Sequence, residues 1–337
     1  SVLKAVENIN TVINKSLKNI EVSDQKKIDQ ILINLDGTDN KKKLGANALL
    51  AVSLASAKAA ARSKKKELYK HLGKKFLLPK PLMNIINGGA HADNNLRIQE
   101  FMIRPDSAKN FMDAIEKCFL VIQNLKKILL SKNLSTNVGD EGGFAPSINS
   151  NEEALEFVVD AIQKSGLKPG KDINICLDVA ANELLNDKGK YSLNSAEFIS
   201  VDESIHYYKK LVSKYPIKSI EDPFAENDWN AWSKLTKEIG KNVQIVGDDL
   251  FVTNVTRLKR GIKEKSANSI LVKVNQIGTL TETLNVIELA KKNNFSTIIS
   301  HRSGDTEDTF IADLAVATQS TQIKTGSLAR SERVAKY

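Results

Sequence analysis

The chain has 337 residues, of which 41% are hydrophobic and 26% charged, so it can bury a large core and is not a disordered protein. Its longest uncharged apolar-rich run, residues 44–57, falls short of the roughly 20 residues that cross a bilayer, and residues 1–20 lack the layout of a signal peptide. We therefore expect a cytoplasmic protein without a transmembrane segment. The net charge of +9 allows nucleic-acid or cell-surface binding, but the lysine clusters have no interleaved aromatic residues, which favours solvated helix faces.

Residues 1 to about 76 are predicted to be helical. Apolar residues between Val2 and Ile13 repeat every 3.6 residues, and Asp24 is a candidate N-cap for a second helix. A third helix, residues 46–62, is rich in alanine and serine, so it can pack closely against the domain that follows. The proline-containing segment 77–81 breaks the helical pattern. We place a domain boundary there, between residues 1–78 and 79–337.

Two apolar runs follow, at residues 82–86 and 98–103. The linker between them is too short for a crossover helix, so the two strands are predicted to be antiparallel. Helices are expected at about 107–130 and 151–165, separated by a glycine-rich loop at 137–146. A polar, hairpin-like insert is predicted at 182–193.

Six further apolar runs each finish on one polar residue. These residues are Asp178, Glu221, Asp248, Lys273, His301 and Lys324. The first step covers 43 residues and the later ones 23 to 28, which suits one strand and one helix per step. With the two earlier strands, this rhythm predicts an α/β protein with an eight-stranded barrel and an active site at the C-terminal ends of its strands.

Three of these strand ends are carboxylates: Asp178, Glu221 and Asp248. Each one alone could be a helix N-cap, but three carboxylates brought together repel one another, and a hard divalent cation relieves that repulsion. We therefore predict a Mg²⁺ site. Asp249 is a second candidate beside Asp248, which we prefer because it is nearer the strand.

Lys273 lies within an otherwise apolar run and is predicted to be a general base, because burial and a nearby cation favour its neutral form. A lysine that only pairs with the carboxylates is the alternative. Lys324 would stay charged and hold an anionic substrate. The segment His301–Gly304 is similar to a phosphate-binding turn. His91, in a glycine-rich loop, is by itself more typical of a loop residue than of a ligand.

Several motifs, in order, resemble the enolase family over nearly the whole chain. They are Leu35–Thr38, Met83–His91, Gln99–Phe101, Gly139–Gly143, Ser219–Pro223, Leu271–Gln276 and Ser300–Gly304. The resemblance implies a TIM-like barrel of the enolase type, with two antiparallel starting strands, two helices and six βα units, preceded by the helical part of an α+β N-terminal domain. It also implies the Mg²⁺-dependent, reversible dehydration of 2-phosphoglycerate to phosphoenolpyruvate in glycolysis and gluconeogenesis.

The resemblance further implies a role for each site residue, including the lysine base that is well known in this superfamily. Asp178, Glu221 and Asp248 would hold the first Mg²⁺, Lys273 would be the base, and Glu141 the acid with Glu100 as its support. The residues implied to contact the small phosphorylated acid are His91, Gln99, His301, Arg302, Ser303 and Lys324.

The family's N-terminal sheet, with the loop that anchors a second Mg²⁺, and its C-terminal end are not found in this sequence. We therefore expect residues 1–337 alone to be an inactive fragment of the enzyme. A homo-oligomer, dimeric or larger, is expected from the resemblance. Two alternatives stay open: a surface- or RNA-associated binding protein with the same fold, and another lyase of the enolase superfamily.

Overall fold

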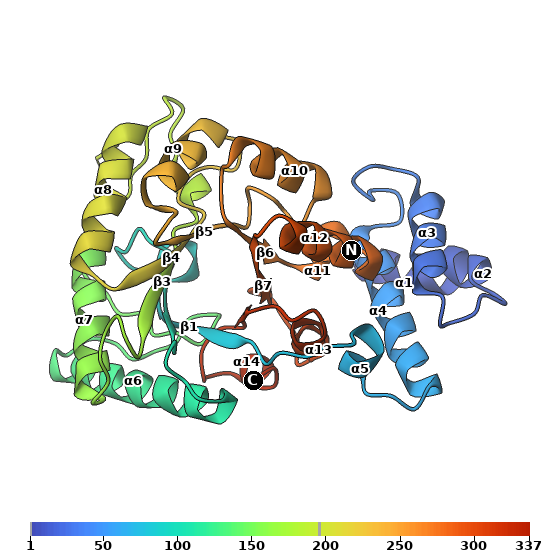
Figure 1. Ribbon diagram of the computed structural model, residues 1–337, viewed down its shortest axis with the longest axis horizontal. Coiled ribbons are helices and arrows are strands. Elements are labelled where there is room, and N and C mark those ends of the chain that lie inside the picture. Colours follow the sequence, from blue (N-terminus) through green and yellow to red (C-terminus); the bar gives the residue numbers. More distant parts are fainter. Residues whose placement is uncertain (1, 195–196) are drawn as a thin grey trace.

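Eight strands close into a barrel and follow one another around it in chain order (Figure 1). The computed structural model describes residues 2–194 and 197–337. The strands are β1 (Lys80–Asn87), β2 (Glu100–Arg104), β3 (Asn174–Asp178), β4 (Ile217–Glu221), β5 (Gln244–Gly247), β6 (Ser269–Val272), β7 (Ser296–Ser300) and β8 (Gln322–Lys324). This architecture confirms the predicted α/β barrel.

The first strands differ from the others in direction. β1 pairs antiparallel with β2, and β2 antiparallel with β3. Every later pair is parallel, including β8 against β1, which closes the barrel. The predicted antiparallel start is therefore confirmed. β2 begins at Glu100, later than the predicted Ile98, because its partner β1 ends at Asn87, the residue that pairs with Glu100.

Helices surround the barrel (Figure 1). They are α6 (Phe111–Ser131), α7 (Asn151–Lys164), α8 (Val201–Lys214), α9 (Trp229–Ile239), α10 (Val255–Glu264), α11 (Val274–Ile277), α12 (Leu280–Lys292), α13 (Phe310–Ala317) and α14 (Ser331–Val334), with short 3₁₀ turns η2 (Gly89–His91) and η3 (Ala181–Leu184). α6 begins later than predicted because Asn110 caps it, accepting the N–H of Asp113 at 2.9 Å.

The insert after β3 is organised by Tyr191. This residue forms isolated β-bridges with both Leu185 and Ile199, so the hairpin-like segment extends beyond the predicted Leu193. Of this segment, residues 195–196 lie outside the described part. The Tyr191 hydroxyl donates to Asp228 at 2.9 Å and thereby ties the insert to the start of α9.

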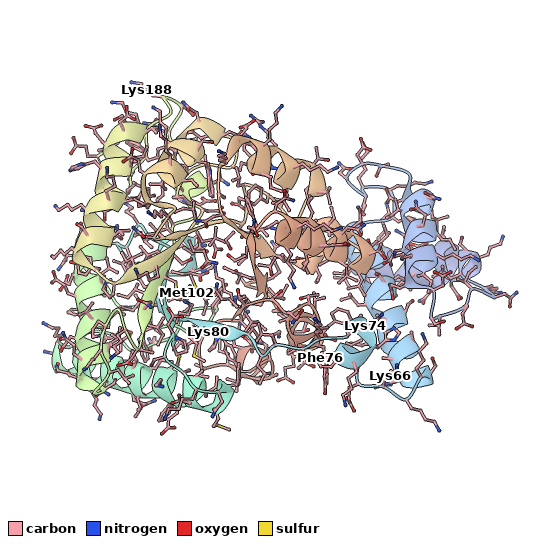
Figure 2. The ribbon with its side chains drawn as sticks, in the orientation of Figure 1. Lys66, Lys74, Phe76, Lys80, Met102 and Lys188 are labelled. Carbon is pink, nitrogen blue, oxygen red and sulfur yellow. The ribbon has the colours of Figure 1, made fainter. Side chains whose placement is uncertain are left out.

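The strands carry two apolar layers. One fills the inside of the barrel and consists of Leu82, Met102, Cys176, Val246, Leu271 and Ile298. Figure 2 shows Met102 within the barrel, whereas Lys66 and Lys188 are exposed at the periphery. Cys176 is fully buried, and burial raises the pKa of its thiol to about 12. The second, larger layer lies between the strands and the surrounding helices.

The N-terminal helices form a smaller unit beside the barrel (Figure 1). They are α1 (Val2–Asn8), a π-helical turn η1 (Ile9–Ile13), α2 (Asn14–Ser16), α3 (Gln25–Asp36), α4 (Ala46–Ser63) and α5 (Leu68–Leu72). Asp24 caps α3 as predicted, since its side chain accepts the N–H of Lys27. Their small core consists of Ile13, Ile28, Leu32, Leu44, Ala48 and Leu49. Among the described residues, no helix is both long and apolar enough to span a membrane.

Polar side chains attach this unit to α12. Asp29, which is fully buried, accepts the N–H of Thr281 at 2.8 Å and its hydroxyl at 2.5 Å. Ser53 on α4 accepts the N–H of Leu280 at 2.9 Å. These contacts occupy the N–H groups at the start of α12, which have no partner within the helix. Close packing of α4 against the barrel is thus confirmed.

We expect Asp29→Ala to weaken this attachment. The substitution leaves the half-buried N–H of Thr281 without an acceptor, and such a loss costs about 1–3 kcal/mol of unfolding free energy. Urea unfolding followed by circular dichroism measures the change. Asp39→Ala, at an exposed position of the same unit, is the control and should be near neutral. Equal stability of the two variants would contradict this account of the attachment.

Candidate active site

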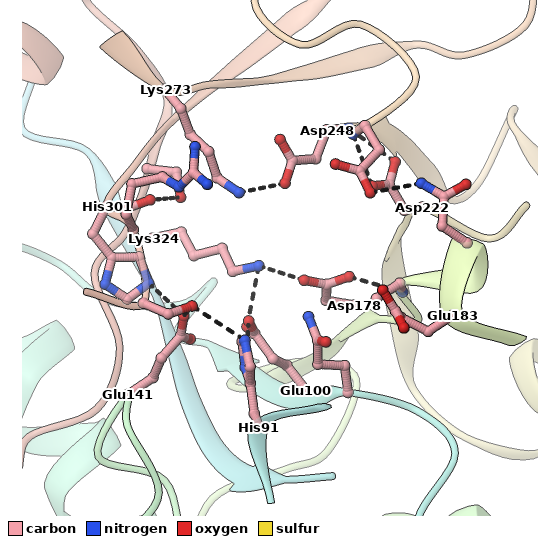
Figure 3. A pocket seen from close by; sticks show the side chains of 17 residues that line it. His91, Glu100, Glu141, Asp178, Glu183, Asp222, Asp248, Lys273, His301 and Lys324 are labelled. Carbon is pink, nitrogen blue, oxygen red and sulfur yellow. Dashed lines mark hydrogen bonds and ion pairs between the residues drawn. The ribbon is translucent and has the colours of Figure 1, made fainter. Parts of the chain in front are cut away.

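A polar pocket opens at the C-terminal ends of the strands, where parallel barrels place their active sites (Figure 3). All but one of the predicted site residues line it: His91, Gln99, Glu100, Glu141, Asp178, Asp248, Lys273, His301, Arg302, Ser303 and Lys324. The remaining one, Glu221, is buried beside the pocket and accepts a hydrogen bond from Lys324. The fold therefore brings the predicted residues together.

Strand register places three carboxylates side by side. Glu100 pairs with Asp178 across β2 and β3, and Asp178 pairs with Glu221 across β3 and β4. Paired positions point to the same face of a sheet, so the three like charges are neighbours. Burial, followed by the neighbouring carboxylates, raises the pKa of Glu100 and of Glu221 well above the usual range. This cluster needs a cation.

Lys324 supplies that cation. Its Nζ lies 2.9 Å from Asp178 and 3.1 Å from Glu100 (Figure 3). It also lies 2.9 Å from Glu221. Burial works against its charge, but the three carboxylates raise its pKa well above the usual value. Lys324 was predicted to stay charged and to hold an anionic substrate. The structure places its ammonium against protein carboxylates.

Lys273 faces Asp248 on the opposite side of the pocket, and the two side chains form an ion pair (Figure 3). Burial opposes the charge of Lys273, but Asp248 outweighs it and raises the pKa of Lys273. We had expected Lys273 to lose its proton more readily. The protein groups alone favour the charged form of Lys273. The expected loss of its proton required a metal cation to take the place of the Lys273 ammonium beside Asp248.

Gln276 is a supporting residue to which the sequence prediction assigned no role. Its amide donates to Asp248 at 2.9 Å, and its carbonyl accepts the hydroxyl of Thr253 at 2.8 Å. Thr253 in turn accepts the backbone N–H of Lys273 at 2.9 Å. Gln276 therefore orients the carboxylate that pairs with Lys273. The sequence could have indicated Gln276, because it lies in the motif Leu271–Gln276 that resembles the enolase family.

Asp222 was also missed. Its carboxylate is buried and accepts the backbone N–H groups of Asp248, at 3.0 Å, and Asp249, at 2.8 Å. Its φ of +42° is unusual for a residue with a side chain, and the two hydrogen bonds hold it there. Asp249 accepts from Asn182 at 2.8 Å, whereas Asp248 faces Lys273. Asp248 and Asp249 both line the pocket, so both stay candidates as metal ligands.

Two groups of possible metal ligands occur in the part of the chain that the structure describes. They are His91, Glu100 and Glu141, and Asp222, Asp248 and Asp249, with ligand atoms within 4.8 Å of one another in each group. The predicted set of Asp178, Glu221 and Asp248 is divided between two lysines instead. Lys324 lies against the first two carboxylates and Lys273 against the third. Its donors are nonetheless all carboxylate oxygens, the ligands that Mg²⁺ prefers.

Glu141 and His301 lie together at another side of the pocket. His301 Nε2 is 3.3 Å from Glu141 Oε1, and Asn84 donates to Glu141 Oε2 at 3.3 Å. Burial raises the pKa of Glu141, but His301, Lys324 and His91 outweigh it and hold this pKa well below the usual range. The pKa of neighbouring Glu100 is shifted in the opposite direction, so of these two carboxyls Glu100 has the higher affinity for a proton.

The turn after β7 carries exposed polar groups at the pocket rim. Arg302 and Ser303 are exposed, whereas His301 is buried. Arg302 donates to Asn275 at 3.3 Å, and the hydroxyl of Ser303 lies 3.2 Å from His91 Nε2. This rim offers a guanidinium and a hydroxyl to an incoming anion.

This fold and site are those of a barrel enzyme with a buried lysine and paired carboxylates at its mouth. Residues 75–337 match the family described as Enolase, C-terminal TIM barrel domain, and residues 1–72 match Enolase, N-terminal domain. The chain is 65% identical over 339 aligned residues to the enolase of Pelagibacter ubique (strain HTCC1062), covering 100% of this chain and 81% of that protein. The chain belongs to the enolase family, whose members are lyases. These matches favour an enzyme over a purely binding protein.

Gly326 offers a test of how closely Glu141 must be placed. A Cβ at Gly326 would lie 2.5 Å from the Glu141 carbonyl oxygen, and the glycine has a φ of +82°. We expect Gly326→Ala to displace the Glu141 loop and to lower kcat roughly tenfold to a hundredfold, since small misplacements of reacting groups cost that much. Steady-state turnover of the full-length protein measures it.

Gly166→Ala is the matched control. Gly166 has a similar φ of +75° but nothing within 4 Å of the added Cβ, so it carries the same backbone strain without the collision. The control variant should lose stability and keep kcat. Equal kcat values for the two variants would show that the contact between Gly326 and the Glu141 loop does not affect catalysis.

Proposed function

We propose that this enolase converts 2-phosphoglycerate to phosphoenolpyruvate and back, with Lys273 as the base and the pair Glu141 and Glu100 as the acid. The expectation that residues 1–337 alone are inactive stays a prediction. The observation that carries this proposal is that one pocket holds a buried lysine and two neighbouring carboxyls with opposite pKa shifts. A dehydration needs a base and an acid, and environments that push pKa values apart separate the two roles.

Lys273 removes the proton from C2 of the substrate. The C–H bond breaks, the proton goes to Nζ, and the electron pair moves into the substrate carboxylate as an ene-diolate. Lys273 must first be neutral, and its ion pair with Asp248 opposes that. The base therefore becomes available when Asp248 turns to another partner.

Mg²⁺ is the partner we propose for Asp178, Glu221 and Asp248. The donor set fits, because it consists of buried carboxylates whose mutual repulsion already raises the pKa of Glu221. When bound, the ion would supply positive charge for the substrate carboxylate as negative charge builds up on it. Among the protein groups, Gln276 and Asp222 hold Asp248 in its orientation.

The pair Glu100 and Glu141 supplies the second proton. The raised pKa of Glu100 favours its protonated form, and Glu141 passes the proton to the C3 hydroxyl. The C3–O bond then breaks, water leaves, and the electron pair from C2 forms the double bond. Such a pair titrates as one unit, so the two carboxyls share one proton in the reaction.

The substrate contacts that we propose follow the pocket lining. They are His91, Gln99, His301, Arg302, Ser303 and Lys324. Arg302 and Ser303, which are exposed at the rim, suit a phosphate group. Lys324, held by carboxylates, suits the substrate carboxylate near the metal ligands.

We also propose a cytoplasmic homo-oligomer that acts in glycolysis and gluconeogenesis, as enolases do. Within the chain, residues 1–78 would form the helical part of one domain and residues 79–337 the catalytic barrel. The separate apolar cluster of the first helices supports this division.

The roles of Lys273 and Glu141 can be tested against each other in the full-length protein. We expect Lys273→Ala to lose exchange of the C2 proton with deuterium by at least about a hundredfold, because no other base replaces it. Glu141→Gln should keep measurable exchange and lose phosphoenolpyruvate formation. Proton NMR of the substrate and phosphoenolpyruvate absorbance give the two readouts. Exchange at the normal rate in Lys273→Ala would exclude it as the base.

A further inference from the structure

Arg333 on α14 is a buried cation that the proposed reaction does not use. Its side chain is 1% exposed, and within the described residues its nearest carboxylate is Glu332, 3.7 Å from Nε. Buried charges are normally paired or fully hydrogen-bonded. The guanidinium of Arg333 instead donates to backbone oxygens and to one imidazole.

The backbone acceptors belong to two loops of the active site. Nη1 donates to Arg302 O at 2.7 Å, and Nη2 donates to Asp140 O at 3.2 Å and to Ser303 O. One loop carries the rim residues after β7, and the other carries Glu141. Arg333 thus joins the loop of the proposed acid to the loop of the proposed phosphate contacts.

The fourth contact concerns His301. Arg333 Nη1 lies 2.5 Å from His301 Nδ1. A guanidinium is always protonated and has only donors, so Nδ1 must be the acceptor. A neutral imidazole then carries its proton on Nε2. That nitrogen is 3.3 Å from Glu141 Oε1 and has no hydrogen-bond partner among the described residues.

We propose that Arg333 is a positioning residue that holds His301 as the neutral tautomer protonated at Nε2, with this N–H directed toward Glu141 and the pocket. The tautomer itself does not depend on the proposed function. The acceptor of this N–H during turnover does depend on the proposed function. A second proton, on Nδ1, would face the guanidinium directly, so the imidazolium form is disfavoured.

The charges around His301 agree with this assignment. Burial, Arg333 and Lys324 lower the pKa of His301, whereas Glu141 raises it, and the net direction is downward. This direction favours the uncharged ring, in agreement with the acceptor role that Arg333 gives to Nδ1. Its Nε2–H lies toward Glu141 Oε1, 3.3 Å away, without a hydrogen bond to it, and can be donated to a substrate oxygen without the ring gaining or losing a proton.

Imidazole ¹⁵N NMR of the protein tests the tautomer without turnover. The chain has four histidines, so comparison with a His301→Asn spectrum assigns the signals of His301. We expect a protonated, pyrrole-type shift at Nε2 and an unprotonated, pyridine-type shift at Nδ1. A proton on Nδ1, or an imidazolium at neutral pH, would overturn the proposal, and the tautomer is read from the wild-type protein itself.

Arg333→Met and Arg333→Lys test the cause. Arg333→Met removes every donor, so His301 should become a mixture of tautomers and titrate at a higher pH. Arg333→Lys retains a cationic donor and should restore the Nε2 tautomer in part. Arg330→Met is the control, because Arg330 pairs with Glu332 at the surface. An unchanged His301 spectrum in a folded Arg333→Met variant would also overturn the proposal.

Measurements of kcat then distinguish a failure of this inference from a failure of the proposed reaction. We expect kcat to fall roughly a hundredfold in Arg333→Met, a typical loss when one oriented donor is removed from an active site. If the wild-type protein has the Nε2 tautomer but does not turn over 2-phosphoglycerate, the reaction assignment fails and the positioning role stands. If it turns over the substrate with the proton on Nδ1, the positioning role fails and the reaction stands.

Discussion

The barrel mouth depends on the ion pairs that the buried ammonium of Lys324 forms with three carboxylates. Strand register places Glu100, Asp178 and Glu221 at neighbouring positions, and three such carboxylates could not stay ionised without a cation. Lys324 comes from β8, the strand that closes the barrel against β1, and its ammonium reaches carboxylates on β2, β3 and β4. The strand that closes the barrel thus also contributes the cation of the site.

The other parts of the site follow the same rule, in which each charge is held by oriented groups. Asp248 is paired with Lys273 and oriented by Gln276, while Asp222 anchors the loop that carries it. Arg333 does the equivalent for the loops on the other side. The pocket thus contains a lysine and a carboxyl pair whose protonation states are set by neighbours, which is what reversible proton transfer requires.

The sequence predicts the part of this arrangement that depends on local pattern. Apolar runs ending on Asp178, Lys273 and His301 indicated the barrel, its active face and the site residues, because strand ends of a parallel barrel meet. It could not show which lysine pairs with which carboxylate, since that depends on strand register and side-chain direction. Arg333 had no local signal, because its partners lie in loops distant in sequence.

The most direct test of the central claim is the stability of Lys324→Met at pH 7 without Mg²⁺, compared with Lys218→Met at an exposed position on β4. Removing one partner of a buried ion pair costs about 3–5 kcal/mol, so urea unfolding should show that loss for Lys324→Met alone. Because the pKa values of Glu100 and Glu221 are raised in the folded state, the variant should regain stability as the pH is lowered, and also on adding Mg²⁺. Equal stability of the two variants at pH 7 would contradict the account.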